Sequence, residues 1–199
     1  MINMNNIKEV LEGLIRENLS DFELDEQFEQ RSVGDKIEND CKEIAKRFFE
    51  TNYISPRSKK SLEDFTLKFG DNINWFDVKT HFIQEVDGFS MPNLVSIDKL
   101  KRSLKNDNES IIYIFVSYKR ENGKITIEHV YLKYIWELDW SILGIGNLGK
   151  GQLQIKNANK EVIFTTEGKE VWGKKLNLEA VKFYNKRIEK IKKELLKWS

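Results

Sequence analysis

The chain has 199 residues, of which 40% are hydrophobic and 12% aromatic, enough for one domain with a substantial core. We therefore expect a single domain over residues 1–199. Cys41 is the one cysteine, which excludes an intrachain disulfide and makes cytoplasmic residence the default expectation. The sequence lacks an apolar run of about 18 residues and the basic and apolar regions of a signal peptide. These absences predict a soluble, unexported protein that does not contact membranes.

The formal net charge of +1 conceals an uneven distribution along the chain. Acidic residues dominate residues 1–30, whereas basic residues dominate residues 174–199. Such asymmetry suits a protein that binds a polyanion on one side, and it fits ordinary solvated helices equally well.

Two amphipathic helices are predicted in the first fifty residues, over 7–15 and 33–49. Both segments place apolar residues at the i, i+3, i+4 spacing of a helix with one buried face. Glu38 lies near the middle of the second helix and is a candidate to support a metal site formed by the next segment. The alternative is a solvated helix glutamate.

Residues 62–82 are predicted to form a tight β-hairpin, because both arms alternate apolar and polar residues. A two-residue turn at Gly70 and Asp71 places Asp64 directly opposite Asp77. Opposed residues point to the same face of a sheet, with Cβ atoms about 5 Å apart, where like charges destabilise the pair. Something must therefore neutralise the two carboxylates.

A bound Mg²⁺ would neutralise them, since this ion takes carboxylate oxygens while keeping several waters. Lys79 emerges on the same face as Asp77 and is placed to contact a water or phosphate at such a metal. Two acids and a lysine in this arrangement are typical of enzymes that cleave phosphodiesters. The alternative is a solvent-facing charged hairpin in which Lys79 merely offsets Asp64 and Asp77.

The middle of the chain predicts a helix and two more strands. Ser96 is placed to cap a helix that begins with residue 97. Residues 111–118 are almost all β-branched or aromatic, which predicts a central strand buried on both faces. Asn122 and Gly123 then predict a hairpin into a second strand over 124–135.

Three glycines at 144, 146 and 149 match a G-x-G-x-x-G pattern. A strand is predicted after them in place of a helix, and Gly151 follows Lys150 where a phosphate-binding loop requires Ser or Thr, so no nucleotide cofactor is expected. We predict a flexible connection here, leading into a hairpin of residues 152–156 and 161–166.

One side of that hairpin carries amide and lysine side chains, which pair with adenine and guanine edges when a β-ribbon enters a DNA groove. The alternative is a polar surface strand. The candidate DNA-binding residues are Gln152, Gln154, Lys156, Asn157 and Asn159.

The last predicted helix has apolar residues at alternating spacings of three and four, the heptad pattern of a coiled-coil seam. This seam packs either on the domain's own sheet or against a second copy in a homodimer. Its members are Val181, Tyr184, Ile188, Ile191, Leu195 and Trp198.

Taken together, these segments resemble type II restriction endonucleases of the PD-(D/E)xK nuclease superfamily, most closely the EcoRV and HincII branch. The resemblance covers most of the chain, and Glu63 stands where the signature proline would precede the first acid. Asp71 and Glu63 therefore remain alternatives to Asp64. The segments that carry the resemblance are RSVGDKIE, SLEDFTLKF, WFDVKTHF, MPNLVSIDKL and NLGKGQLQIKNAN.

The resemblance implies an α/β (α+β) fold, with a mixed central β-sheet flanked by helices. It further implies that Asp64, Asp77 and the Val78 carbonyl bind one or two Mg²⁺ ions while Lys79 orients or deprotonates the attacking water. The implied function is Mg²⁺-dependent cleavage of both strands of DNA at a short palindrome by a homodimer. The alternatives are a structure-directed repair or recombination nuclease of the same superfamily, and a DNA-binding protein without catalysis.

Overall fold

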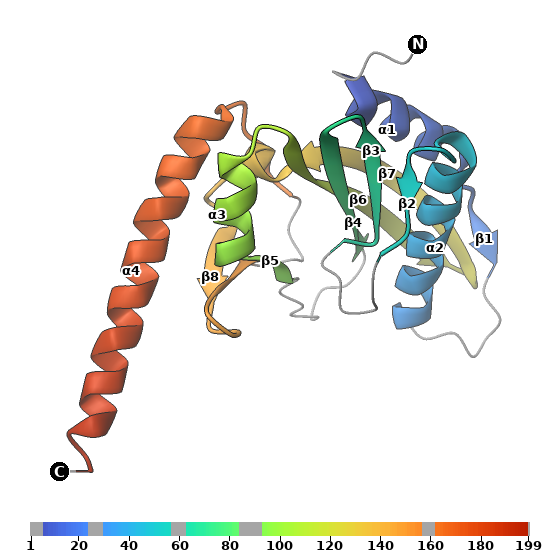
Figure 1. Ribbon diagram of the computed structural model, residues 1–199. Helices are drawn as coiled ribbons and strands as arrows, with labels where there is room; N and C mark the ends of the chain where they lie inside the picture. Colours follow the sequence, from blue (N-terminus) through green and yellow to red (C-terminus); the bar gives the residue numbers. More distant parts are fainter. Residues whose placement is uncertain (1–5, 24–29, 57–62, 84–92, 157–161, 199) are drawn as a thin grey trace.

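The computed structural model describes residues 6–23, 30–56, 63–83, 93–156 and 162–198. Figure 1 shows the chain as two sheets with helices around them. In chain order the elements are α1 (Ile7–Asn18), β1 (Phe22–Glu23), α2 (Gln30–Phe48), β2 (Tyr53–Ile54), β3 (Phe65–Phe69), β4 (Asn72–Phe82), β5 (Asn93–Ser96), α3 (Ile97–Lys105), β6 (Glu109–Glu121), β7 (Lys124–Tyr134), η2 (Ile135–Glu137), β8 (Leu143–Gly146), β9 (Gln152–Ile155) and α4 (Lys169–Leu195).

The larger sheet has six strands in the order β1-β7-β6-β4-β3-β2. Strands β4 and β6 run parallel, whereas the other neighbours are antiparallel, so the sheet is mixed, as predicted. The smaller sheet has the order β5-β9-β8 and is antiparallel. The predicted α+β fold with a mixed central sheet flanked by helices is therefore confirmed.

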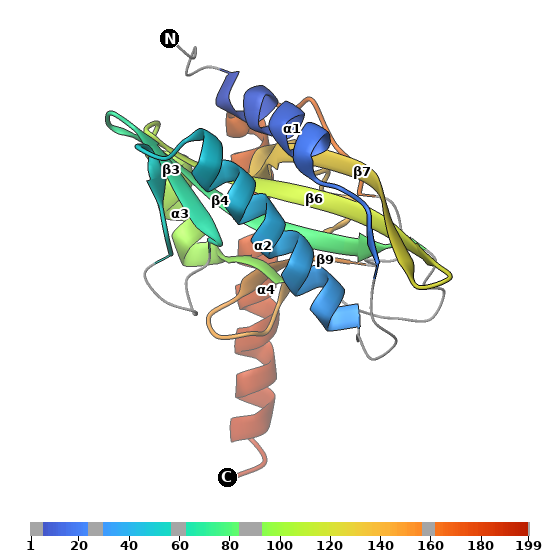
Figure 2. The ribbon, with the colours of Figure 1, turned by 90° about the vertical axis from the view of Figure 1, so that its right-hand side faces the viewer.

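Strand β6 is buried on both faces, as its continuous apolar sequence predicts. Ile112 and Ile114 point into one hydrophobic core, while Ile111 and Tyr113 point into another. The first core lies under α1 and α2, which cross one face of the large sheet, as Figure 2 shows. Each helix buries most of the apolar stripe that predicted it, although Phe48 at the end of α2 is 40% exposed.

The second core covers the opposite face of the large sheet. Helix α3, the small sheet and the first half of α4 supply its side chains. Trp172 is fully buried there, and its indole Nε1 donates a 2.8 Å hydrogen bond to the carbonyl oxygen of Leu138. Helix α4 is therefore anchored to the body by its first turns.

One prediction about the hairpin of β3 and β4 is wrong, because the second core covers the face that was expected to be exposed. The alternation of its residues predicts one buried face and one exposed face. Thr66 and Asp77, on the polar face, are nevertheless buried. The sequence pattern did not reveal this burial, because the cover comes from elements that follow more than ten residues later in the chain.

Both predicted hairpins between long strands form with turns that their residues favour. Gly70 has a φ of 59°, and Asn122 and Gly123 have φ values of 51° and 80°. Left-handed conformations at both central residues define the type I′ turn that Asn-Gly favours. Ser96 also accepts a 3.4 Å hydrogen bond from the backbone N–H of Lys99, which confirms the predicted helix cap.

The predicted flexible connection before β9 is wrong, and so is the predicted partner of β9. Residues 143–146 form strand β8, which pairs with β9 so that Gly144 faces Gln154 and Gly146 faces Gln152. Glycine is a poor strand former, but the glycines of β8 leave room for side chains of the neighbouring strand β9. Of the expected second arm, 161–166, Phe164 bridges Leu138 instead. Glu161 lies outside the described residues.

Helix α4 continues well beyond the two sheets, and the C-terminus lies far from the rest of the molecule (Figure 1). Its residues beyond Tyr184 are almost all exposed. Among the described residues, no helix is both long enough and apolar enough to span a membrane.

Candidate active site

The hairpin of β3 and β4 has the register expected from its sequence. Phe65 faces Phe76 and Phe69 faces Asn72, which leaves Gly70 and Asp71 as the two-residue turn. Beyond the paired residues, the backbone N–H of Asp64 donates a 2.8 Å hydrogen bond to the carbonyl of Phe76. Asp64 is therefore held at the open end of the hairpin, beside β4.

The carboxylate of Asp64 is fixed by the backbone of the facing strand. Its Oδ2 atom accepts a 2.7 Å hydrogen bond from the N–H of Val78. This bond favours the ionised carboxylate, but partial burial outweighs it and raises the pKa of Asp64 above its ordinary value. The structure thus brings Asp64 next to the Asp77, Val78 and Lys79 triplet, as the sequence predicted.

Asp77 is only 5% exposed and lies against Lys79. The Nζ atom of Lys79 donates a 2.8 Å hydrogen bond to Asp77 Oδ1. The other carboxylate oxygen, Oδ2, lies equally close to the ammonium but is buried without a hydrogen bond among the described residues. A buried carboxylate oxygen without a hydrogen bond is available to coordinate a cation.

Burial sets the electrostatics of Asp77. It raises the pKa of Asp77 to about 7, against the lowering effect of the Lys79 ammonium. The nearby charge of Asp64 raises the Asp77 pKa further. The burial of Asp77 contradicts a hairpin whose charged face lies in solvent, while the Lys79 to Asp77 ion pair of that alternative is present.

Helix α2 contributes a further acid to the surroundings of Asp64. The negative charge of Glu38 is near enough to raise the Asp64 pKa. Its carboxylate accepts a 2.8 Å hydrogen bond from Lys42, one turn later in the helix. Glu38 is therefore both close to the candidate site and already paired with a lysine.

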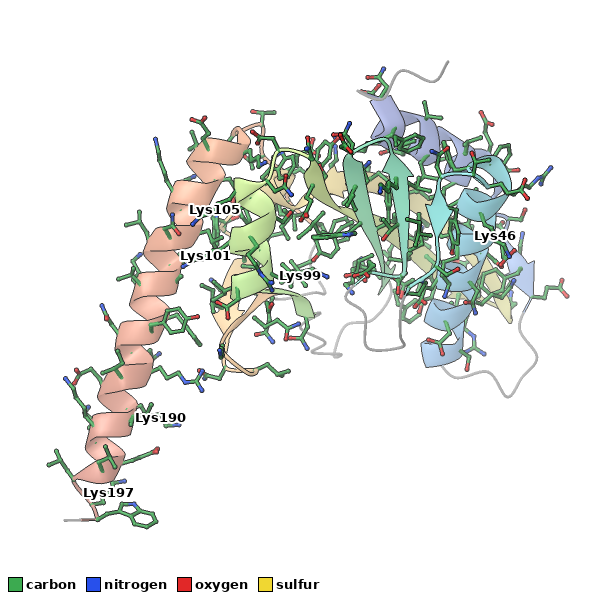
Figure 3. All side chains as sticks on the ribbon, in the orientation of Figure 1. Lys46, Lys99, Lys101, Lys105, Lys190 and Lys197 are labelled. Atoms are coloured by element: carbon green, nitrogen blue, oxygen red, sulfur yellow. The ribbon has the colours of Figure 1, made fainter. Side chains whose placement is uncertain are left out.

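Helix α3 contributes a lysine that the sequence did not single out. Lys99 projects from α3 toward the large sheet (Figure 3), where its ammonium lies 3.1 Å from Glu63 Oε2 and 4.6 Å from the centroid of the Trp75 ring. Glu63 immediately precedes Asp64, so this ion pair ties α3 to the acidic end of the hairpin. The pairing depends on tertiary contacts 36 residues apart in the chain.

The site residues fit a divalent cation of the magnesium type. Two carboxylates with raised pKa values face one lysine, and one buried carboxylate oxygen lacks a hydrogen bond. Within residues 6–23, 30–56, 63–83, 93–156 and 162–198, no cluster of three or more His, Cys, Asp or Glu residues could hold a metal. Mg²⁺ needs no such cluster, because it is commonly bound through one or two carboxylates and keeps several waters.

The described members of the predicted DNA-binding set lie on β9 and just after it, in the small sheet. We call Gln152, Gln154 and Lys156 the polar row; Asn157 and Asn159 lie outside the described residues. The Gln154 side chain donates a 2.6 Å hydrogen bond from Nε2 to Oδ1 of Asn93 on β5. This bond fixes the orientation of the Gln154 amide, and Asn93 was not predicted as a site residue.

The glycines of β8 shape the polar row. A Cβ atom at Gly146 would meet the amide group of Gln154, and one at Gly144 would lie 2.5 Å from Cε of Lys156. The Gln154 and Lys156 side chains therefore lie across the bare backbone of β8. The G-x-G spacing, which suggests a nucleotide site at first sight, serves the packing of these side chains.

The polar row connects to the hairpin of β3 and β4 through β5 and α3. Gln152 pairs with Ser96, and Ser96 caps the helix that carries Lys99. Lys99 in turn contacts Glu63, next to Asp64. A ligand that touched both the row and the hairpin would thus meet one continuous set of elements.

Comparisons with known proteins give one kind of match. No protein-family profile and no curated protein matches the sequence. Among solved structures, the NlaIV restriction endonuclease is similar, with a TM-score of 0.52 and 14% sequence identity over 92% of this chain and 90% of that one. At this identity the likeness shows the fold, which is restriction-endonuclease-like. The predicted placement in the EcoRV and HincII branch stays a prediction.

Proposed function

We propose that this protein is a Mg²⁺-dependent endonuclease that cleaves both strands of DNA at a short palindromic sequence. One observation carries the proposal: the buried Asp77, with an unbonded Oδ2, lies beside Asp64 and Lys79 on a hairpin of a restriction-endonuclease-like fold. Buried acids with perturbed pKa values beside a lysine are typical of catalytic sites.

Asp64, Asp77 and the Val78 carbonyl would hold the metal. When bound, Mg²⁺ stabilises charge on the scissile phosphate and lowers the pKa of a coordinated water. The Val78 N–H keeps Asp64 oriented, and burial keeps Asp77 from rotating into solvent. These contacts fix the two acids before a ligand arrives.

Lys79 would orient the attacking water and help to remove its proton. Its ammonium is now engaged by Asp77 at 2.8 Å, and 23% of its side chain is exposed, so it borders both the acid and the solvent-accessible side. A cation bound by Asp77 would compete with this ion pair and release the ammonium toward the water.

Sequence recognition is assigned to the polar row. Glutamine pairs with adenine N6 and N7, and lysine reaches the acceptors of guanine in the major groove. The bond from Gln154 to Asn93 leaves the Gln154 carbonyl oxygen and one amide hydrogen for a base. A palindromic site matches a homodimer, since the two-fold symmetry of the protein mirrors that of the DNA.

The test is incubation of the purified protein with a plasmid of known sequence and Mg²⁺, beside the Lys79→Ala and Lys68→Ala variants. Lys68 is a matched control, because it is an exposed lysine on the same hairpin but lies near the turn, at the opposite end from Asp64 and Asp77. We expect discrete fragments from the native protein and from Lys68→Ala, and intact plasmid with Lys79→Ala.

Other outcomes separate the alternatives. If the native protein gives a smear of products and the Lys79→Ala variant gives none, the protein is a structure-directed nuclease with the same catalytic residues. Intact DNA in every reaction, across several substrates and with Mn²⁺ in place of Mg²⁺, would contradict the nuclease proposal and leave a DNA-binding protein.

A further inference from the structure

The free part of α4 carries an apolar stripe that the body of the protein does not bury. Val181, Ile188, Ile191 and Leu195 are all about half or more exposed, and Trp198 is 90% exposed. The body-facing residues of α4 are a different set, Trp172, Leu176 and Ala180. In the described part of the chain, the stripe therefore lacks a partner in the same molecule.

The spacing of the stripe is that of a coiled-coil seam. With Val181 at heptad position a, the a positions are 181, 188 and 195 and the d positions are 184, 191 and 198. Tyr184 belongs to the seam but is half-buried, and its hydroxyl donates a 2.8 Å hydrogen bond to the carbonyl of Lys150. Such a seam is complementary to another helix, since each side chain inserts between four residues of the partner.

The seam is complementary to a second copy of itself in antiparallel orientation. With a two-fold axis between Glu189 and Lys190, Ile188 packs against the partner's Ile191. In the flanking layers, Val181 meets the partner's Trp198, and Tyr184 meets the partner's Leu195. In the two flanking layers a smaller side chain thus meets a larger one, which is how well-packed cores fill space.

The charges beside the seam favour the same orientation. Arg187 and Glu194 occupy g positions, which face each other in an antiparallel pair, so each Arg187 meets the partner's Glu194. A parallel pair would place Arg187 against the partner's Lys192, a repulsive contact. Arg187 already donates a 2.8 Å hydrogen bond to the carbonyl of Gly149 through Nη1, and its other nitrogens remain for the partner.

Two lysines of this helix segment lie away from the seam. Lys190 and Lys197 lie on the free part of α4 (Figure 3), at heptad positions outside a, d, e and g. A DNA backbone would contact such lysines and leave the apolar stripe in water. The stripe therefore calls for an apolar partner.

We infer that the occupant of this surface is a second copy of the chain, bound through an antiparallel pair of α4 helices centred between residues 189 and 190. This inference rests on the homodimer proposed above and gives it an interface. It does not depend on the nuclease activity.

The first experiment measures the dimer dissociation constant by sedimentation equilibrium for the native protein, Leu195→Glu and Leu196→Glu. The two leucines are adjacent, 65% and 74% exposed, and both far from the cores, but only Leu195 lies on the seam. We expect a native dimer, a dissociation constant raised about a hundredfold or more by Leu195→Glu, and little change in Leu196→Glu. Circular dichroism of each variant checks that the helix is intact.

The second experiment tests the orientation by charge exchange. Glu194→Arg should weaken the dimer, and the double variant Arg187→Glu with Glu194→Arg should restore it, because the two charges meet across the antiparallel interface. Failure of the double variant to restore affinity would contradict the antiparallel register.

DNA cleavage assays on the same samples separate this inference from the proposed function. A monomeric native protein that still cuts DNA, or equal dimerisation by Leu195→Glu and the native protein, overturns the α4 interface and leaves the nuclease standing. Loss of DNA binding by Leu195→Glu without loss of the dimer also overturns it. A native dimer sensitive to Leu195→Glu that cuts no DNA supports the interface and contradicts the nuclease.

Discussion

The β3–β4 hairpin, the candidate catalytic hairpin, and the polar row both come from strands of alternating polarity, yet the polar side is buried in the first and partly exposed in the second. Asp77 is buried against Lys79, whereas Gln154 stays partly open to solvent above the glycines of β8. In the hairpin, burial shifts a pKa to about 7 and fixes the acid. In the row, a neutral amide is oriented by one hydrogen bond to Asn93.

The difference corresponds to the two tasks proposed for these strands. Groups that bind a metal must be held in place. Burying their charge costs desolvation free energy, which the bound ligand later offsets. Groups that read a base must remain accessible, because the base has to replace their water. Four predictions test this division, starting with the largest expected effect.

Asp77→Asn should reduce cleavage of cognate DNA by about a thousandfold or more, because it removes the proposed metal ligand and its negative charge. DNA affinity measured in Ca²⁺ or without metal should change little, since Asp77 is buried and lies away from the strand proposed to contact the bases. Gel-shift and single-turnover cleavage assays measure the two effects. An equal loss of binding and of cleavage would contradict the division between the two regions.

Gln154→Ala should reduce discrimination at one base pair of the recognition site by about 10- to 100-fold, the cost of one lost bidentate contact. Cleavage of the best site should stay within that range, because the hairpin is untouched. Competition among substrates with single base changes gives the measurement.

Gly146→Ala offers a steric version of the same test. The new Cβ would meet the flexible end of Gln154 and displace its amide, without contact to the hairpin. A selectivity change like that of Gln154→Ala is expected. Unchanged selectivity in both variants would contradict the proposal that the polar row recognises the DNA sequence.

The Mg²⁺ concentration that gives half-maximal cleavage should rise by up to about tenfold per pH unit below pH 7. The proton on Asp77, whose pKa is raised to about 7, competes with the metal there. Mg²⁺ titrations of the cleavage rate between pH 5.5 and about 8.5 measure this shift. A pH-independent Mg²⁺ requirement would mean that Asp77 is not a ligand.

The smallest expected effect is on stability without metal. The folded pKa of Asp77 is about 7 and its ordinary value is 3.8, so the folded state retains a proton that the unfolded state loses. The stabilising contribution of Asp77 is complete below pH 3.8 and is lost as pH rises through 7. At pH 8, Asp77→Asn should therefore raise Tm by about 3 °C or more.

The same substitution should have a much smaller effect near pH 5, where Asp77 is already neutral in the folded state. Calorimetry in EDTA at both pH values provides the comparison. Asp98→Asn, at the exposed start of α3, is the matched control and should show no gain at pH 8.

The sequence by itself determined the features that depend on neighbours along the chain. The hairpin register follows from a two-residue turn at Gly70, and the register alone brings Asp64 beside the Asp77 to Lys79 triplet. Asn122 and Gly123 fixed the second hairpin, and helical periodicity gave α1, α2 and α4. In each case the responsible interactions lie within one element or one turn.

Only the tertiary structure decided which polar faces are buried and which residues meet across elements. Asp77 lies beside Tyr113 on the face of the large sheet that the second core covers, and the elements of that core come later in the chain. The Lys99 to Glu63 ion pair, the Gln154 to Asn93 hydrogen bond and the pairing of β9 with β8 likewise join separate elements. The period of a strand's sequence shows which residues share a face. Whether a polar face is buried depends on the elements that pack against it, and these come from distant parts of the chain.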